Sequence, residues 1–331
     1  MDKIFDAPDE SSVVALEPPD PASLSAWAAL YFQLNVLGSP IKTQQAKQRV
    51  LSLFLSFFAT EVGHDQVDGW TPAVTKAFLS SLRSRTSAAT GKKLAVTTIN
   101  RVLASVRHFG RWLHQRRPLL AGSPFEGVKD LVPDRPAWNG LSSRQVLRLK
   151  SACEQRLKAC TRRDQDPLLE GAVFHVLLNT GLREFELCGL DLAQFHHRGF
   201  HGVTRKGQRV SDKVPVPGEA RDWLDRYLDE SRGREPGPLF LSRRGSRIQE
   251  QDVRRICHRI SAQACAQLPK DERFRLNPHQ LRHTFLKRIA DKHGVHVAQR
   301  MSGNVSIREV FRYTQPSQDE MDELAESVFD A

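Results

Sequence analysis

The sequence predicts a mainly helical protein with a small antiparallel β-sheet, organised as two domains. Apolar residues recur at helical spacing through most of the chain, and short β runs occur only after about Gln194. A stretch rich in glycine and proline, residues 121–140, shows no helical period and separates two helical regions. A length of 331 residues also favours two domains over one.

The N-terminal part is predicted to be a leader followed by a small helical domain. Residues 1–20 contain three prolines and six acidic residues, which is typical of a mobile leader. Residues 21–120 form the helical domain, with one helix from Thr43 to Val62 and another from Thr97 to Gln115. The apolar face of the second helix consists of Ile99, Leu103, Val106, Phe109, Trp112 and Leu113.

The linker 121–140 leads into a larger, mostly helical domain predicted over residues 141–315. Ser142 is a suitable N-cap for its first helix. The β runs of this domain are Phe195–Phe200, Gly202–Arg205 and Lys213–Val216. Residues 316–331 form a tail with six acidic residues and no basic one. Its apolar residues at helical spacing are Met321, Leu324, Val328 and Phe329.

The charge distribution indicates a polyanionic partner. The formal net charge is +11, but the acidic ends carry −5 over residues 1–20 and −6 over residues 316–331, so the rest carries +22. Nucleic acid is the most common partner of so basic a body. Five cysteines without a CxxC pair fit a reducing compartment, and no secretory signal or membrane-spanning run is evident. We therefore expect a cytoplasmic, nucleoid-associated protein, and a bacterial one.

Basic residues cluster around the second helix of the N-terminal domain. They could form an ordinary solvated face, or a surface that follows DNA phosphates. The total charge favours the second interpretation for the cluster as a whole. The candidate DNA-binding residues are Lys92, Lys93, Arg101, Arg107, Arg111, Arg116 and Arg117.

An arginine follows a helix end in the segment LLNTGLREFEL. The glycine at 181 is a normal C-terminal residue of a helix, and Arg183 then begins the next one. Glu186 stands three residues later and could orient the guanidinium. An arginine held at a turn in this way suits bidentate binding of a phosphate. A structural ion pair is the alternative.

A second segment, NPHQLRH, starts a helix with Asn277 as N-cap. His279 and Arg282 are neighbours at i, i+3 in its first turn, where the helix dipole favours an anion. His279 and His283 also have the i, i+4 spacing of two zinc ligands. A zinc hydrolase would need a glutamate directly after the first histidine, where this chain has Gln280. We therefore expect no metal, and a core role for His283.

A third segment, GNVSIREVFRY, contains a candidate nucleophile. Gly303 ends one helix, and the spacing of Ser306 and Glu309 predicts a capping box that begins the next. Tyr313 lies about two turns further on and is one of three tyrosines in the chain. The alternative is a packed aromatic residue.

Together these segments resemble the tyrosine recombinase (phage integrase) family. The family pattern has T-G-L-R-x-x-E-L, then H-x-x-R, then a Gly-His with a tyrosine nine residues after that histidine. Thr180 to Leu187 and His279 to Arg282 match, and Tyr313 follows Asn304 by nine residues. The family hairpin lysine, commonly in G-K-G before V-P, resembles Lys206. The resemblance covers nearly the whole chain after the leader.

The resemblance implies a C-shaped DNA clamp, with a helical core-binding domain and a catalytic domain that cuts and rejoins DNA without metal or ATP. Tyr313 would form a 3′-phosphotyrosyl bond while Arg183 and Arg282 hold the phosphate. His279 would assist proton transfer, and Lys206 would protonate the leaving 5′ oxygen. Lys213 competes for that last role. The tail would dock on a neighbouring subunit of a tetramer, or pack on its own subunit.

Asn304 stands where the family usually has histidine, and asparagine cannot carry a proton at neutral pH. This leaves the second-histidine role in doubt. The resemblance predicts integration, excision or resolution of a mobile element or replicon. The alternatives are a type IB topoisomerase-like or telomere-resolving enzyme, and a non-catalytic DNA-binding regulator derived from a recombinase. No cofactor is expected.

Overall fold

The chain forms two compact units, residues 1–135 and 136–331, and each is described by itself. The computed structural model describes residues 17–88, 90–133, 140–159, 165–205, 207, 209–303, 321 and 325–327. The division between the units falls inside the glycine- and proline-rich range 121–140.

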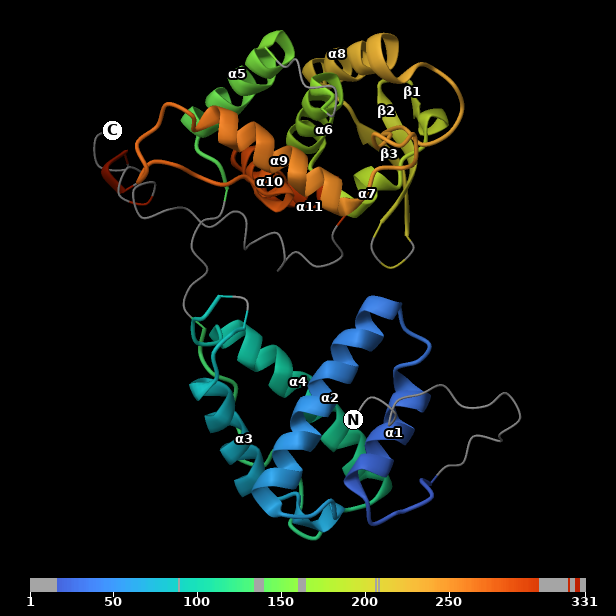
Figure 1. Ribbon diagram of the computed structural model, residues 1–331, viewed down its shortest axis with the longest axis vertical. Coiled ribbons are helices and arrows are strands. Elements are labelled where there is room, and N and C mark those ends of the chain that lie inside the picture. The colour runs from blue at the N-terminus through green and yellow to red at the C-terminus, as the bar shows by residue number, and fades with distance from the viewer. Residues whose placement is uncertain are drawn as a thin grey trace. The chain divides into compact units, whose positions relative to one another are not determined.

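The first unit is helical in its described part (Figure 1). Its helices are α1 (Leu24–Asn35), α2 (Ile41–Val62), α3 (Pro72–Ser84) and α4 (Val96–Arg116), with a 3₁₀ turn η2 at Val67–Gly69. The helices predicted over 43–62 and 97–115 are confirmed to within two residues at each end. Two of the four begin at side-chain caps, Ser23 for α1 and Thr71 for α3.

Aromatic side chains fill the core of the first unit. The Trp70 ring lies 4.7 Å from that of Phe54 and 5.5 Å from that of Phe109, measured between ring centroids. Its indole nitrogen donates to Thr75 Oγ1 at 3.0 Å, so the one polar atom of this buried ring has a partner. Packing of this kind holds the four helices together around one core.

The second unit contains seven α-helices and one sheet among its described residues (Figure 1). The helices are α5 (Ser143–Ala159), α6 (Pro167–Thr180), α7 (Glu184–Cys188), α8 (Gly218–Tyr227), α9 (Glu250–Ala264), α10 (Pro278–His293) and α11 (Val295–Ser302). A 3₁₀ turn η3 covers Leu192–Gln194 and a π-turn η4 covers Leu228–Arg232. The predicted N-cap of α5 is confirmed, because the Ser142 hydroxyl accepts from Gln145 N at 3.2 Å.

Helix α6 is buried along nearly its whole length and forms the centre of this unit. It packs closely on α8, since a Cβ added at Gly171 would lie 2.0 Å from the Trp223 ring. The helix ends at Gly181, whose φ of 64° is left-handed, as the sequence predicts. The end of a rigid, buried helix therefore positions the residues that follow it.

The sheet is antiparallel, with order β1–β2–β3. Its strands are β1 (Phe195–His196), β2 (Gly199–Thr204) and β3 (Val210–Pro215). The prediction of one run over Phe195–Phe200 was wrong, because a tight turn at His197 and Arg198 interrupts it. Both residues have positive φ, 47° and 61°, as a primed hairpin turn requires. Such turns are usually marked by glycine or asparagine, and neither is present.

Two general features of the described residues complete the fold. Cys153, Cys188, Cys257 and Cys265 are buried free thiols, while Cys160 lies outside the described residues. Burial raises the pKa of Cys257 to about 12, which keeps this thiol protonated. No helix in the described ranges is both long enough and apolar enough to cross a membrane.

Candidate active site

Arg183 sits between the end of α6 and the start of α7, where it is the N-cap residue. Its backbone N–H donates to Glu186 Oε2 at 2.9 Å, and its Nη1 donates to Glu186 Oε1 at 3.0 Å. The carboxylate thus fixes both the main chain and the guanidinium of Arg183, which confirms the pairing predicted from the sequence.

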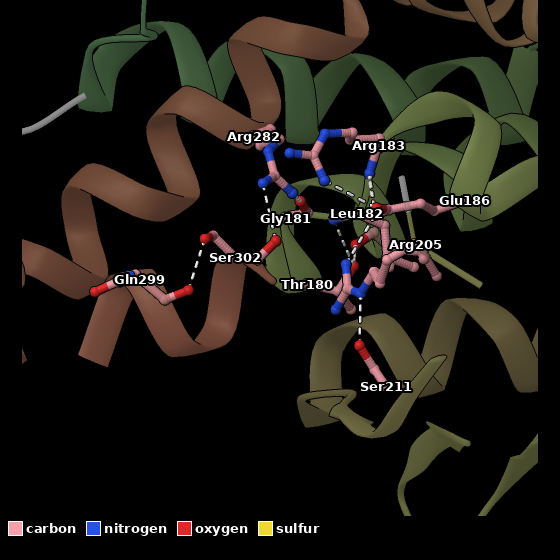
Figure 2. A network of polar contacts seen from close by, with 11 residues as sticks. Thr180, Gly181, Leu182, Arg183, Glu186, Arg205, Ser211, Arg282, Gln299 and Ser302 are labelled. Atoms are coloured by element: carbon pink, nitrogen blue, oxygen red, sulfur yellow. Dashed lines mark hydrogen bonds and ion pairs between the residues drawn. The ribbon is translucent and has the colours of Figure 1, made fainter. Parts of the chain in front are cut away.

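Glu186 is shared by two arginines (Figure 2). Besides Arg183, it accepts from Arg205 Nη1 at 2.8 Å. The Glu186 side chain is 0% exposed and that of Arg205 is 6% exposed, so this ion pair is shielded from water. Arg205 also donates from Nε to Ser211 Oγ at 2.7 Å. The sequence reasoning missed Arg205, whose position directly before Lys206 was the only signal.

Arg282 is nearly inaccessible, with 1% of its surface exposed. Its Nη1 donates to the carbonyl oxygen of Gly181 at 2.5 Å and its Nη2 to that of Ser302 at 2.9 Å (Figure 2). Helix α10 begins as predicted, at the N-cap Asn277 and with Pro278 in its first turn. Arg282 therefore links α10 to the C-terminal ends of α6 and α11.

His279 lies in the first turn of α10, on the same helix as Arg282. Its ring is solvent-accessible but partly desolvated, and this lowers its pKa; Glu184 opposes the shift, while Arg282, Arg183 and Arg254 add to it. This shift favours the neutral ring of His279, which is the form that can accept a proton.

The second histidine of this helix, His283, has its pKa lowered to about 4, chiefly by burial. The side chain is only partly buried, so the predicted core role holds in part. Within the described ranges, no group of three or more His, Cys, Asp or Glu side chains is arranged to hold a metal ion.

Of the two candidate lysines on the hairpin of β2 and β3, the structure describes only Lys213. Lys213 pairs with His201 across the strands, and its stem covers Gly199, where an added Cβ would lie 2.9 Å from Lys213 Cε. Arg205, at the other end of β2, contacts Glu186. The Lys213 side chain thus lies over the start of β2, next to β1. Arg205, which directly precedes Lys206, instead contacts the carboxylate of Glu186 that also holds Arg183.

Three of the predicted site residues, Lys206, Asn304 and Tyr313, lie outside the described residues. Nearly all of the tail 316–331 and the capping box of Ser306 and Glu309 also do. The roles given to them stay predictions. Gly303, directly before Asn304, ends α11 with a left-handed φ of 65°, as predicted.

The basic residues of the first unit divide into two groups. Arg107 forms an ion pair with Asp130 at 2.8 Å, and Arg117 pairs with Asp68 at 3.0 Å, so both have partners within the unit. The others are exposed, and they are Lys92, Lys93, Arg101, Arg111 and Arg116. The Arg116 guanidinium stacks over the Trp112 ring at 4.3 Å. For both groups, contact with DNA phosphates stays a prediction.

A second ion pair borders the site and was also missed. Glu184, next to Arg183, pairs with Arg254 of α9, and Arg254 also lies 3.3 Å from Glu250. Arg254 thereby offsets the negative charge that Glu184 brings close to His279. No local pattern predicts this ion pair, because the two residues are 70 positions apart.

The site as a whole carries a fixed positive charge. Glu186 offsets one of its two arginine partners, and Arg282 adds its own charge close to the same helix end. Positive groups that are held rigidly in a shielded setting stabilise a phosphate, and still more the charge that develops when it is attacked. The arrangement suits chemistry at a phosphodiester.

Comparison with known proteins gives an independent result. Residues 140–320, more than half of the chain, match the model of the phage integrase family. The chain is 29% identical over 250 residues to the tyrosine recombinase XerC of Corynebacterium efficiens, covering 74% of this chain and 76% of that protein. It is 30% identical over 244 residues to the tyrosine recombinase XerC of Mycobacterium bovis, covering 71% and 78%.

A solved structure shares the fold. The integrase of the transposon Tn1549, in complex with a circular intermediate DNA, aligns with a TM-score of 0.70 at 18% identity. The alignment covers 93% of this chain and 99% of that one.

Proposed function

Because the chain belongs to the phage integrase family of tyrosine recombinases, we propose that it cleaves and rejoins double-stranded DNA at specific core sites. The reaction would integrate, excise or resolve a mobile element or replicon. The relatives named above and the basic body of the chain support DNA as the partner. We expect it in the bacterial cytoplasm, bound to the nucleoid.

One observation carries this proposal: the two motif arginines are brought to one helix end. Arg282 Nη1 donates to the carbonyl oxygen of Gly181, and Arg183 follows Gly181 by two residues. The T-G-L-R and H-x-x-R boxes, about 100 residues apart, thus form one positive site. A purely structural ion pair at Arg183 would not need a second arginine of another motif beside it.

The proposed step is an in-line transfer of a phosphoryl group. The Tyr313 oxygen attacks the phosphorus and forms a new P–O bond, while the bond from phosphorus to the 5′ oxygen breaks. The tyrosine proton passes to neutral His279, and Lys206 supplies a proton to the leaving 5′ oxygen. Arg183 and Arg282 stabilise charge on the non-bridging oxygens. The phosphotyrosine keeps the bond energy, so religation needs no ATP.

The acidic tail is proposed to join neighbouring subunits into a tetramer on two DNA sites. A suitable acceptor is a hollow of about 480 Å³ near the end of α9. Its lining combines the apolar Cys265 and Phe274 with Arg273 and Arg275. Apolar and basic groups together match a tail with six acids and four apolar residues at helical spacing. Deletion of residues 316–331 should leave binding to a single site intact and abolish pairing of two sites in native gels.

The decisive experiment is the capture of the covalent intermediate. The purified protein is incubated in excess EDTA with DNA of its native element, nicked near candidate sites so that the cleaved strand escapes. A protease-sensitive protein–DNA adduct is expected on denaturing gels, and Tyr313→Phe should abolish it. Sequencing of the adduct then locates the scissile phosphate.

The alternatives give different results. Tight, specific DNA binding without any adduct would favour the non-catalytic regulator. Asn304 would then be the first residue to test as the cause of the missing cleavage. An adduct that relaxes supercoils but never exchanges strands between two labelled sites would favour a topoisomerase-like enzyme. An adduct that forms without EDTA but is lost when EDTA is added would contradict the metal-independent tyrosine mechanism.

A further inference from the structure

We propose that Arg205 is a positioning residue of the active site, which keeps Glu186 from neutralising Arg183. This inference rests on the proposed function. Arg205 stands where the family pattern commonly has glycine, directly before the hairpin lysine. We therefore assign the positioning role to this chain and not to the family in general.

The argument begins with the charge on Glu186. A carboxylate with 0% side-chain exposure beside a single arginine would cancel the charge of Arg183 and hold its guanidinium back from a phosphate. Arg205 contacts the same carboxylate, with Nη1 2.8 Å from Oε2. Two guanidiniums on one carboxylate leave a net charge of +1, and Glu186 still orients Arg183.

The position of Arg205 is fixed on three sides. Its Nε donates to Ser211 Oγ of β3 at 2.7 Å, and its backbone N–H donates to the carbonyl oxygen of Arg209 at 2.6 Å. On the third side it packs against Gly303, where an added Cβ would lie 3.1 Å from Arg205 Nε. Arg205 thus touches α7 through Glu186, the loop end of the β2–β3 hairpin, and the end of α11.

These contacts connect three parts of the proposed catalytic machinery. The hairpin carries Lys206 directly after Arg205, Glu186 holds Arg183, and Gly303 directly precedes Asn304. A buried arginine with such partners is expensive to place unless every contact is made. Two requirements explain why Arg205 lies where α7, the hairpin and the end of α11 meet. The phosphate site needs a net positive charge, and the hairpin needs a fixed position relative to that site.

The test compares cleavage of two substrates. Single-turnover adduct formation is measured with a normal phosphodiester at the scissile position and with a methylphosphonate, which has one charged oxygen replaced by methyl. Arg205→Ala should slow cleavage of the phosphodiester about tenfold or more, since the loss of one oxyanion donor costs about a hundredfold. The defect should be several-fold smaller on the methylphosphonate, which needs less positive charge.

Two further variants keep the outcome clear. Arg205→Lys retains the charge and should recover part of the rate on the phosphodiester. Arg156→Ala is a matched control, because Arg156 and Arg259 share the buried Glu170 in the same unit, each at 2.6 Å. Its removal should lower thermal stability without changing the ratio of the two substrate rates.

The outcomes separate this inference from the function beneath it. Equal slowing of Arg205→Ala on both substrates, or none, would overturn the positioning role while the wild-type adduct still supports the recombinase. If Arg205→Ala fails to fold, the substrate ratio of Arg205→Lys decides: a ratio equal to wild type, with a slowed rate, overturns the proposal. Absence of the wild-type adduct would overturn the function and the inference together.

Discussion

Replacement of Glu186 by glutamine should destabilise the second unit strongly. The side chain is 0% exposed and its two oxygens accept from Arg183 Nη1, Arg183 N and Arg205 Nη1. Hydrogen bonds to charged groups contribute about 1.5–3 kcal/mol each. Glutamine keeps one acceptor oxygen for the Arg183 N–H but turns an N–H₂ group towards an arginine. Two charge-assisted bonds are therefore lost or weakened.

A second estimate leads to the same range. Removal of one partner from a buried ion pair costs about 3–5 kcal/mol, because a charge stays buried without compensation. A unit of about 200 residues loses about 2–4 °C in melting temperature per kcal/mol. The expected decrease for Glu186→Gln is thus about 6–20 °C in calorimetry of the full chain. Adduct formation should also slow, because Arg183 is no longer oriented.

Glu170→Gln provides the control for Glu186→Gln. Glu170 is 2% exposed and also lies between two arginines, Arg156 and Arg259, but on the part of the unit away from Arg183. The Glu170→Gln variant should lower the melting temperature by a similar amount, and it should leave the rate of adduct formation unchanged below that temperature. A melting temperature of Glu186→Gln within about 3 °C of wild type would refute the reasoning, because the carboxylate would then carry less than about 1 kcal/mol.

Three further predictions concern other parts of the second unit. Arg282→Ala leaves the buried carbonyls of Gly181 and Ser302 without this donor, which should cost about 2–6 kcal/mol in urea unfolding, and an effect below about 1 kcal/mol would contradict it. Burial lowers the pKa of His175 to about 4, so the unfolded chain binds the proton first and stability should fall as pH drops from 6.5 to 4. His175→Phe should flatten that pH dependence, and an unchanged slope would contradict the assignment. Gly181→Ala should destabilise by more than about 1 kcal/mol, because φ is +64° and the new Cβ would lie 2.3 Å from the Phe285 ring; unchanged unfolding would rule this out.

The family, the helices and the helix ends within the motifs could be predicted from the sequence. The resemblance to the phage integrase family is confirmed by the match over residues 140–320. The stop of α6 at Gly181 and the start of α10 at Asn277 depend on residues that are adjacent in the chain, which is why local patterns find them. The pairing of Arg183 with Glu186 is local as well.

The contacts that complete the site could not be predicted in this way. Arg205 reaches Glu186 over 19 positions, and Arg282 reaches Gly181 over 101. The position of Arg205 directly before Lys206 is its only sign in the sequence, and an exposed hairpin arginine would show the same sign. The same limit applies to the ion pairs of Arg107 with Asp130 and of Arg117 with Asp68, which the sequence did not reveal. Contact of these two arginines with DNA phosphates stays a prediction.

The bonds made by Arg282 also bear on how such a site survives divergence. Both of its acceptors are main-chain oxygens, which every amino acid at positions 181 and 302 would supply. Selection at those two positions can therefore act on backbone geometry and local packing, with no demand for a particular polar side chain. As long as Arg282 is kept, such a contact persists while neighbouring residues change, and a shift of a helix end breaks it. We therefore expect relatives that share less than a third of their residues to keep these two hydrogen bonds, with different residues around them.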